Sequence, residues 1–278
     1  TTGASNTAVG AASLGSNTTA ADNTAVGYAS LNANTTGDNL TAVGSGALTA
    51  NTTGTANTSV GKNSMYNSTT AIDNSAFGVN SLFTNTTGSL NTAIGRNALL
   101  VNTTGANNTS LGARTLEANT TASNNTAVGY QALTANTTGG EHTAVGKGAL
   151  DSNTTGNYNN AFGVNALGTT TTGAHNIGLG RDALSTSATA TGQCTLGDAN
   201  ISNLRCNDTS ISALSDSRDK TNVIDSPYGL DFINTVRPVQ FLWDTRDGNA
   251  KDGSTRIGFL AQELLEATDG NNAVLDLV

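Results

Sequence analysis

The sequence contains few of the residues that build a compact globular core or a disulfide framework. Among 278 residues there are two prolines, two cysteines and one tryptophan, and aromatic residues make up only 4%. Charged residues make up 12%, with a net charge of −8. This acidic balance disfavours nucleic acid and anionic membrane surfaces as partners. No apolar run reaches the roughly 18 residues of a membrane span, so we expect no membrane insertion.

The cysteines and the ends of the chain allow two further expectations. Cys194 and Cys206 form no CxxC pair, so they set no disulfide framework. We expect two small buried thiols near a domain boundary rather than a disulfide. Because the chain begins TTGASN without Met, we expect it to be a piece of a longer protein, which leaves secretion open.

What the sequence has in abundance is Asn, Thr, Ala and Gly, arranged in a strict tandem repeat. A branched or aromatic apolar residue precedes Gly once in every repeat, and the 17-residue period holds with no insertion or deletion. A second large apolar residue, usually Leu, follows five positions later, and we call these residues the +5 column. The consensus is NTAVGxxALxxNTTGxx. The residues before Gly, the pre-glycine column, are Val9, Val26, Val43, Val60, Phe77, Ile94, Leu111, Val128, Val145, Phe162, Leu179 and Leu196.

A strict period in units too short to bury a core alone indicates stacked coils. Gly, Asn and Thr are poor helix formers, whereas Gly suits tight corners between short strands. The sequence therefore predicts a mainly β fold, a parallel β-solenoid or β-roll of twelve 17-residue coils over residues 1–200. Two bulky residues per coil make a thin core, so we expect three chains to pool these residues in a homotrimer.

For two further columns of the repeat, the residue types predict solvent exposure in one case and corner structure in the other. The position two residues after the pre-glycine residue holds large polar side chains in several coils, so this column is predicted to face solvent. Its members include Tyr28, Lys62, Arg96, Tyr130, Lys147 and Arg181. The recurring NTTG predicts corners closed by Asn and Thr side chains, with stacked Asn residues forming amide ladders. NTT is also a glycosylation sequon, but turn chemistry already explains the triplet.

After residue 200 the period degrades and the composition changes. Residues 201–214 form a transition segment, and residues 215–278 are predicted to form a small α+β domain. In this domain YGLDFINTVRPVQFLWD predicts a short helix, a stop at Pro238 and then a strand. GFLAQELLEAT has the spacing of an amphipathic helix.

Two stretches of the chain resemble known families. SDSRDK, then LDFINTVRPVQFLWD, then IGFLAQEL resembles the peptidase S74 domain, the intramolecular chaperone at the C-terminus of phage tail spikes and endosialidases. The repeat NTAVG followed by AL resembles the head repeats of YadA-like trimeric adhesins and phage fibre shafts. Together these resemblances imply a trimeric, extracellular, surface-binding fibre. Because S74 members commonly continue into a long coiled-coil helix, we expect the domain here to be truncated.

The S74 resemblance also implies self-cleavage after trimerisation. It assigns Ser215 as the nucleophile and Lys220 as the general base, with Asp216 and Arg218 at the remaining fixed positions of the motif. A Ser hydroxyl needs a base, and Lys serves as one only when burial or a nearby positive charge such as Arg218 lowers its pKa. Cleavage before or directly after Ser215 stays open. So does the alternative of a charged, solvated turn without chemistry.

The leading hypothesis is a trimeric phage tail fibre, located in the virion, with a host cell-surface receptor or glycan and other tail proteins as partners. The alternative with the same fold is a bacterial surface adhesin or extracellular filament. An ice-binding solenoid is disfavoured, because NTT places its threonines on opposite sides of a strand.

A glycan-cleaving shaft is disfavoured because no carboxylate pair recurs in the repeat. His142 and His175 lie at different repeat positions and no acidic residue recurs in every coil, so we expect no metal and no cofactor.

Overall fold

The computed structural model describes residues 2–203, 230–242, 255–260 and 263. The chain divides into two compact units, Thr1–Arg205 and Cys206–Val278, and each is described by itself.

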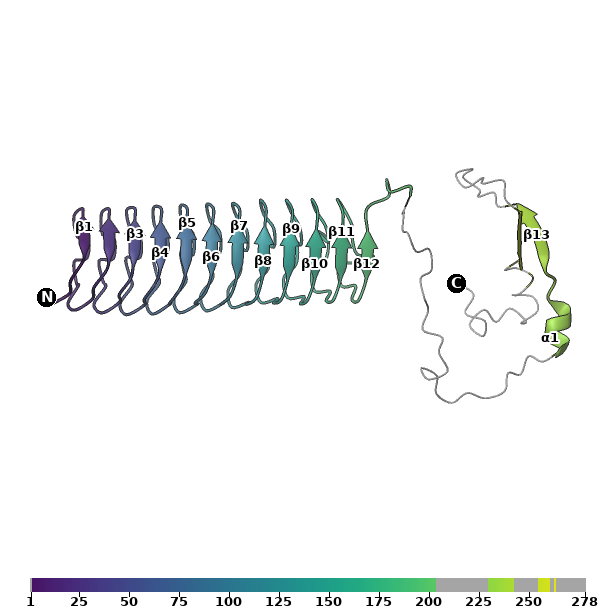
Figure 1. The fold of residues 1–278 in the computed structure, drawn as a ribbon, viewed down its shortest axis with the longest axis horizontal. Helices are drawn as coiled ribbons and strands as arrows, with labels where there is room; N and C mark the ends of the chain where they lie inside the picture. Colours follow the sequence, from purple (N-terminus) through teal and green to yellow (C-terminus); the bar gives the residue numbers. More distant parts are fainter. Residues whose placement is uncertain (1, 204–229, 243–254, 261–262, 264–278) are drawn as a thin grey trace. The chain divides into compact units, whose positions relative to one another are not determined.

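The first unit is a parallel β-solenoid, as predicted. Twelve strands of three residues pair in chain order in a single parallel sheet, one strand per coil (Figure 1). Each residue pairs with the equivalent residue of the next coil, as in Thr24 with Thr41. The strands are β1 (Thr7–Val9), β2 (Thr24–Val26), β3 (Thr41–Val43), β4 (Thr58–Val60), β5 (Ser75–Phe77), β6 (Thr92–Ile94), β7 (Thr109–Leu111), β8 (Thr126–Val128), β9 (Thr143–Val145), β10 (Asn160–Phe162), β11 (Ile177–Leu179) and β12 (Cys194–Leu196).

The glycine after each strand is required both by its backbone angle and by the stacking of coils. In the first eleven coils its φ lies between 118° and 141°, a region that side chains other than glycine rarely adopt. A Cβ placed on Gly27 would lie 2.5 Å from the carbonyl oxygen of Gly44 in the next coil. The chain therefore turns tightly here while adjacent coils stay at strand spacing.

The coil interior is filled by small residues from the strand and by the +5 column. The middle residue of most strands is Ala, as in Ala25 and Ala42, and both are fully buried. In ten successive coils the +5 residue has a φ of 49° to 53°, which is uncommon for a bulky side chain. Burial of that side chain, complete in Leu31 and Leu48, offsets the backbone strain.

The pre-glycine column does not share this interior. Side chains of successive strand residues point to opposite faces, so an inward Ala directs the residues on either side of it outward. Phe77 and Leu111 are 39% and 43% exposed. Of the two bulky columns, the coil interior of the single chain therefore takes only the +5 column.

Two buried amide ladders run along the solenoid, which confirms the predicted stacking of Asn. In the NTTG column, Asn102 Nδ2 donates to Asn85 Oδ1 at 2.9 Å, and Asn119 Nδ2 donates to Asn102 Oδ1 at 2.8 Å. In the column of the first consensus Asn, the backbone N–H of Asn91 donates to Asn74 Oδ1 at 2.9 Å. The ladders give buried polar groups their partners and fix the spacing of the coils.

The described part of the second unit contains one short helix and a hairpin-like pair of strands. Helix α1 (Leu230–Thr235) ends before Pro238, and β13 (Val239–Leu242) follows, as the sequence predicts. Strand β14 (Thr255–Gly258) pairs with β13 antiparallel. The predicted amphipathic helix begins at Gly258, which instead ends β14, and most of that segment lies outside the described residues.

Candidate functional site

The residues of the predicted cleavage motif, Ser215, Asp216, Arg218 and Lys220, lie outside the described residues. What the structure describes of the same unit is α1, β13, β14 and an ion pair between Arg237 and Glu263. This ion pair joins the RP segment to the AQE segment, two parts of the pattern on which the S74 resemblance rests.

The expectation of buried thiols is wrong for Cys194. Its side chain is exposed and the thiol is free. The reason is its place as the first residue of β12, where strand alternation points the side chain outward. Cys206 lies outside the described residues.

The outer sheet face is a regular surface that runs along all twelve coils of the solenoid. We define it as the first and third residues of strands β1 to β12, the third being the pre-glycine column. The first position holds Thr in most coils and Ser, Asn, Ile or Cys in the others, and neither position holds a charged residue in any coil. Twelve outward apolar side chains therefore form a continuous uncharged strip.

The predicted solvent-facing column borders this strip and is confirmed. Tyr28 is 65% exposed, and Lys62, Arg96 and Lys147 are exposed as well. These residues directly follow the turn glycine, whereas the outer sheet face precedes it. The long polar side chains thus stand at the edge of the apolar strip.

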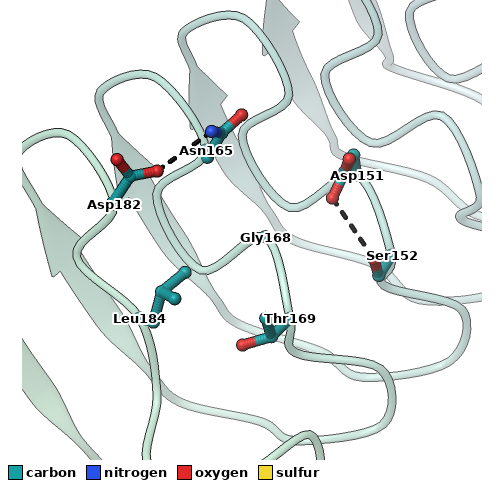
Figure 2. Close-up of a pocket in the computed structure, with 7 residues that line it drawn as sticks. All are labelled: Asp151, Ser152, Asn165, Gly168, Thr169, Asp182 and Leu184. Carbon is teal, nitrogen blue, oxygen red and sulfur yellow. Dashed lines mark hydrogen bonds between the residues drawn. The ribbon is translucent and has the colours of Figure 1, made fainter.

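A recess lies on the turns that follow β9, β10 and β11 (Figure 2). It is lined by Asp151, Ser152, Asn165, Gly168, Thr169, Asp182 and Leu184. Asn165 Nδ2 donates to Asp182 Oδ1 at 2.9 Å, and Ser152 Oγ donates to Asp151 Oδ1 at 3.2 Å. Carboxylates, an amide and hydroxyls beside one apolar side chain can hydrogen-bond the hydroxyl groups of a saccharide.

The recess exists because the repeat is irregular there. Gly168 has no side chain at a position that carries Thr134 and Asp151 in the two preceding coils. Leu184, a +5 residue, is 38% exposed, and Ser185 is buried with its Oγ 2.8 Å from Thr170 Oγ1. The sequence signal, which our predictions did not use, is STSATATG in place of the usual NTTG corner.

His142 occupies a rung of the second amide ladder. Its backbone N–H donates to Asn125 Oδ1 at 3.0 Å, and its Nδ1 accepts the backbone N–H of Asn159 at 3.1 Å. Burial lowers the pKa of His142 to about 4. The neutral ring therefore acts as a structural replacement for Asn.

No group of three His, Cys, Asp or Glu side chains in the described ranges is arranged to hold a metal ion. Within the same ranges, no helix has the length and hydropathy needed to cross a membrane.

Comparison with known proteins bears on the second unit. Residues 215–275 match the peptidase S74 family model, described as chaperone of endosialidase. This match confirms the resemblance inferred from SDSRDK, LDFINTVRP and GFLAQEL. No curated protein and no solved structure matches the chain.

Proposed function

We propose that this chain forms a trimeric phage tail fibre, in which the solenoid is the shaft and residues 215–275 act as an intramolecular chaperone. The observation that carries the proposal is the succession, in one chain, of a twelve-coil solenoid and a match to a chaperone of endosialidase. The family fits a tail-fibre-like function. A bacterial surface adhesin or extracellular filament is the alternative with the same fold.

The repeat itself explains why a shaft of this kind needs a chaperone. Each coil resembles its neighbours so closely that two chains displaced by one coil still pair similar surfaces. Folding of such repeats can begin at many coils, and the chains can then assemble out of register. A terminal domain that joins three chains first would align their ends before the coils stack.

Self-cleavage would release the chaperone once assembly is complete. Lys220 takes the proton of Ser215 Oγ as this oxygen attacks the Leu214 carbonyl carbon, and the amide nitrogen of Ser215 leaves with a proton. Water then hydrolyses the resulting ester, which restores the Ser hydroxyl and frees the Leu214 carboxylate. Cleavage after Ser215 would instead need the Ser215 hydroxyl of a neighbouring chain to attack the Ser215 carbonyl carbon, because attack by its own hydroxyl would close a four-membered lactone; water would again hydrolyse the ester. Burial in the trimer, with Arg218 nearby, would lower the Lys220 pKa enough for this role.

The test is the intact mass of the freshly expressed chain under denaturing conditions, beside Ser215→Ala and Lys220→Ala. Ser217→Ala, two residues from the proposed nucleophile, is the matched control. We expect two fragments from the wild type and from the control, and a single 27.9 kDa species from the other two variants. A wild type that stays whole while trimeric would overturn self-cleavage and leave the chaperone role in place. Fragments from Ser215→Ala would overturn the assignment of the nucleophile.

Host binding is the second part of the proposal, with a cell-surface receptor or glycan as the ligand, other tail proteins as partners and the virion as the location. Within the described shaft, the recess between Asp151 and Asp182 has groups suited to saccharide hydroxyls. Asp182→Ala also removes the acceptor for Asn165 Nδ2. Loss of glycan-array binding in this variant, with Asp73→Ala as a control on a distant coil, is the expected result.

The ice-binding hypothesis has less support from the strands. Thr recurs at the first strand position, but the adjacent outward column changes among Val, Phe, Ile and Leu. Such unequal side chains do not present the uniform lattice that ice requires, so we expect no thermal hysteresis.

A further inference from the structure

The outer sheet face has the character of an interface, and its apolar side chains are left partly exposed by the described residues. The outward residues of the middle coils, such as Phe77, Ile94 and Leu111, keep more than a third of their surface exposed. Soluble proteins rarely leave a continuous apolar strip of this length uncovered. Some partner must therefore cover the strip along the whole solenoid.

Several classes of partner are disfavoured by the residues of the strip. Basic residues such as Lys62 and Lys147 border the strip, but the net charge of −8 of the whole chain disfavours an anionic membrane surface. A saccharide would need convergent polar groups, whereas every pre-glycine residue is apolar. A crystalline surface such as ice would need outward side chains of equal size, whereas the pre-glycine residues vary from Val to Phe. An identical solenoid meets the remaining requirement, because it is equally long, uncharged and apolar on the same face.

We propose that copies of this chain pack against one another through the outer sheet face, in register, with equivalent coils at the same height. This inference rests on the proposed trimeric fibre and names the surface that forms it. Each pre-glycine residue then meets its own equivalents in the other chains. The Thr side chains beside them fill the margin of the contact.

The sizes of the pre-glycine residues set the register within this face. Phe occurs at only two levels, Phe77 at the end of β5 and Phe162 at the end of β10, which lie five coils apart. In register, the rings of each level meet one another. A shift by one coil would place Phe77 against Val60 or Ile94 and Phe162 against Val145 or Leu179, which leaves gaps at some levels and overpacks others. These two levels therefore oppose the slip that a uniform repeat would allow.

The experiment uses the full chain in a Cys194→Ser, Cys206→Ser background, with single cysteines added. Val128→Cys places a thiol on the outer sheet face. Tyr130→Cys, two residues away in the solvent-facing column, is the matched control. We expect Val128→Cys to form an interchain disulfide under mild oxidation, in at least ten-fold higher yield than Tyr130→Cys.

Register is measured by co-expressing differently tagged Val128→Cys and Val145→Cys chains, whose thiols lie one coil apart. In-register packing predicts disulfides between like chains and few between unlike chains. Abundant mixed disulfides would overturn the register, and equal or greater cross-linking of Tyr130→Cys would overturn the face.

Light scattering of the wild-type chain separates failure of this inference from failure of the proposed function. A wild type of trimeric mass that does not cross-link through Val128→Cys refutes only the outer sheet face as the contact. A folded wild type of monomeric mass refutes the trimeric fibre itself.

Discussion

Asn51 and Ser68 occupy consecutive rungs of the NTTG amide ladder, and both Asn51 Oδ1 and Ser68 Oγ are buried without a hydrogen-bond partner in the described part of the chain. In most other coils of this ladder the rung holds an Asn, as where Asn119 Nδ2 donates to Asn102 Oδ1. Serine is too short to reach its neighbour. The ladder is therefore interrupted at Ser68, and this interruption leaves two buried polar atoms unsatisfied. A second interruption lies at Thr170, and the preceding Asn153 Oδ1 is likewise buried without a partner in the described residues.

Ser68→Asn should repair the ladder and stabilise the solenoid. The new Nδ2 would donate to Asn51 Oδ1, and a satisfied buried acceptor is worth about 1–2 kcal/mol. The check is the midpoint of chemical denaturation, followed by circular dichroism. Thr70→Asn, at an exposed position of the same corner, is the control and should leave the midpoint unchanged. An unchanged midpoint in Ser68→Asn would contradict the expected repair.

Asn102→Ala should have the opposite effect, because this residue bonds in both directions along the ladder. Asn102 Nδ2 donates to Asn85 Oδ1 and to Gly105 O, and its Oδ1 accepts from Asn119. Its loss leaves at least two buried groups unsatisfied, at about 1–3 kcal/mol each. Hydrogen exchange should show faster exchange in the coils on both sides of residue 102. Protection equal to the wild type would show that water replaces the lost bonds.

His142 should make the solenoid less stable in acid. Its pKa lies near 4 in the folded chain, below the usual 6.5, so the unfolded chain binds more protons between these two values. Its contribution is fully present above about pH 6.5 and is lost as the pH falls toward 4, a change on the order of 3 kcal/mol. His142→Asn restores the consensus residue and removes this dependence. The measurement is the free energy of unfolding at pH 7 and pH 4.5 for both proteins, and equal pH dependence in the two would exclude His142 as its source.

Two glycine substitutions should separate steric exclusion from backbone strain. Gly95→Ala places a Cβ 2.5 Å from the carbonyl oxygen of Gly112 at a φ of 136°, so we expect a loss of more than about 3 kcal/mol or failure to fold. Gly192 also has a positive φ, 72°, but a Cβ there meets nothing within 4 Å. Gly192→Ala should cost only about 1 kcal/mol. The measurement is thermal unfolding. Similar losses of stability in the two variants would show that contact with the next coil is not what excludes a side chain at the corner.

The features predicted from the sequence are those that every coil repeats. The period indicates twelve coils, and the mixture of Lys, Arg and Tyr in one column indicates exposure. The outward direction of the pre-glycine residue is not predicted, because Val or Leu before Gly is compatible with either face until the small Ala at the centre of the strand is recognised as the inward residue. The prediction for Cys194 is wrong for the same reason.

Features confined to one coil are harder to predict. Leu184 is partly exposed while the next residue, Ser185, is buried. Which of two neighbouring side chains is buried cannot be predicted from either position alone. The left-handed backbone at Leu31 and its equivalents contradicts the usual preference of leucine and follows from the closed path of the coil. The cleavage residues Ser215 and Lys220 stay a prediction, since they lie outside the described residues.

The strands of the solenoid pair only with the strand before and the strand after, always at an offset of one coil. Any interior coil can therefore be removed or duplicated without changing the chemistry of the joint that remains. Each such change would alter the length of the solenoid by one strand spacing, about 4.8 Å. Recombination between near-identical stretches of the gene would thus lengthen or shorten the shaft by whole coils and leave both of its ends unchanged.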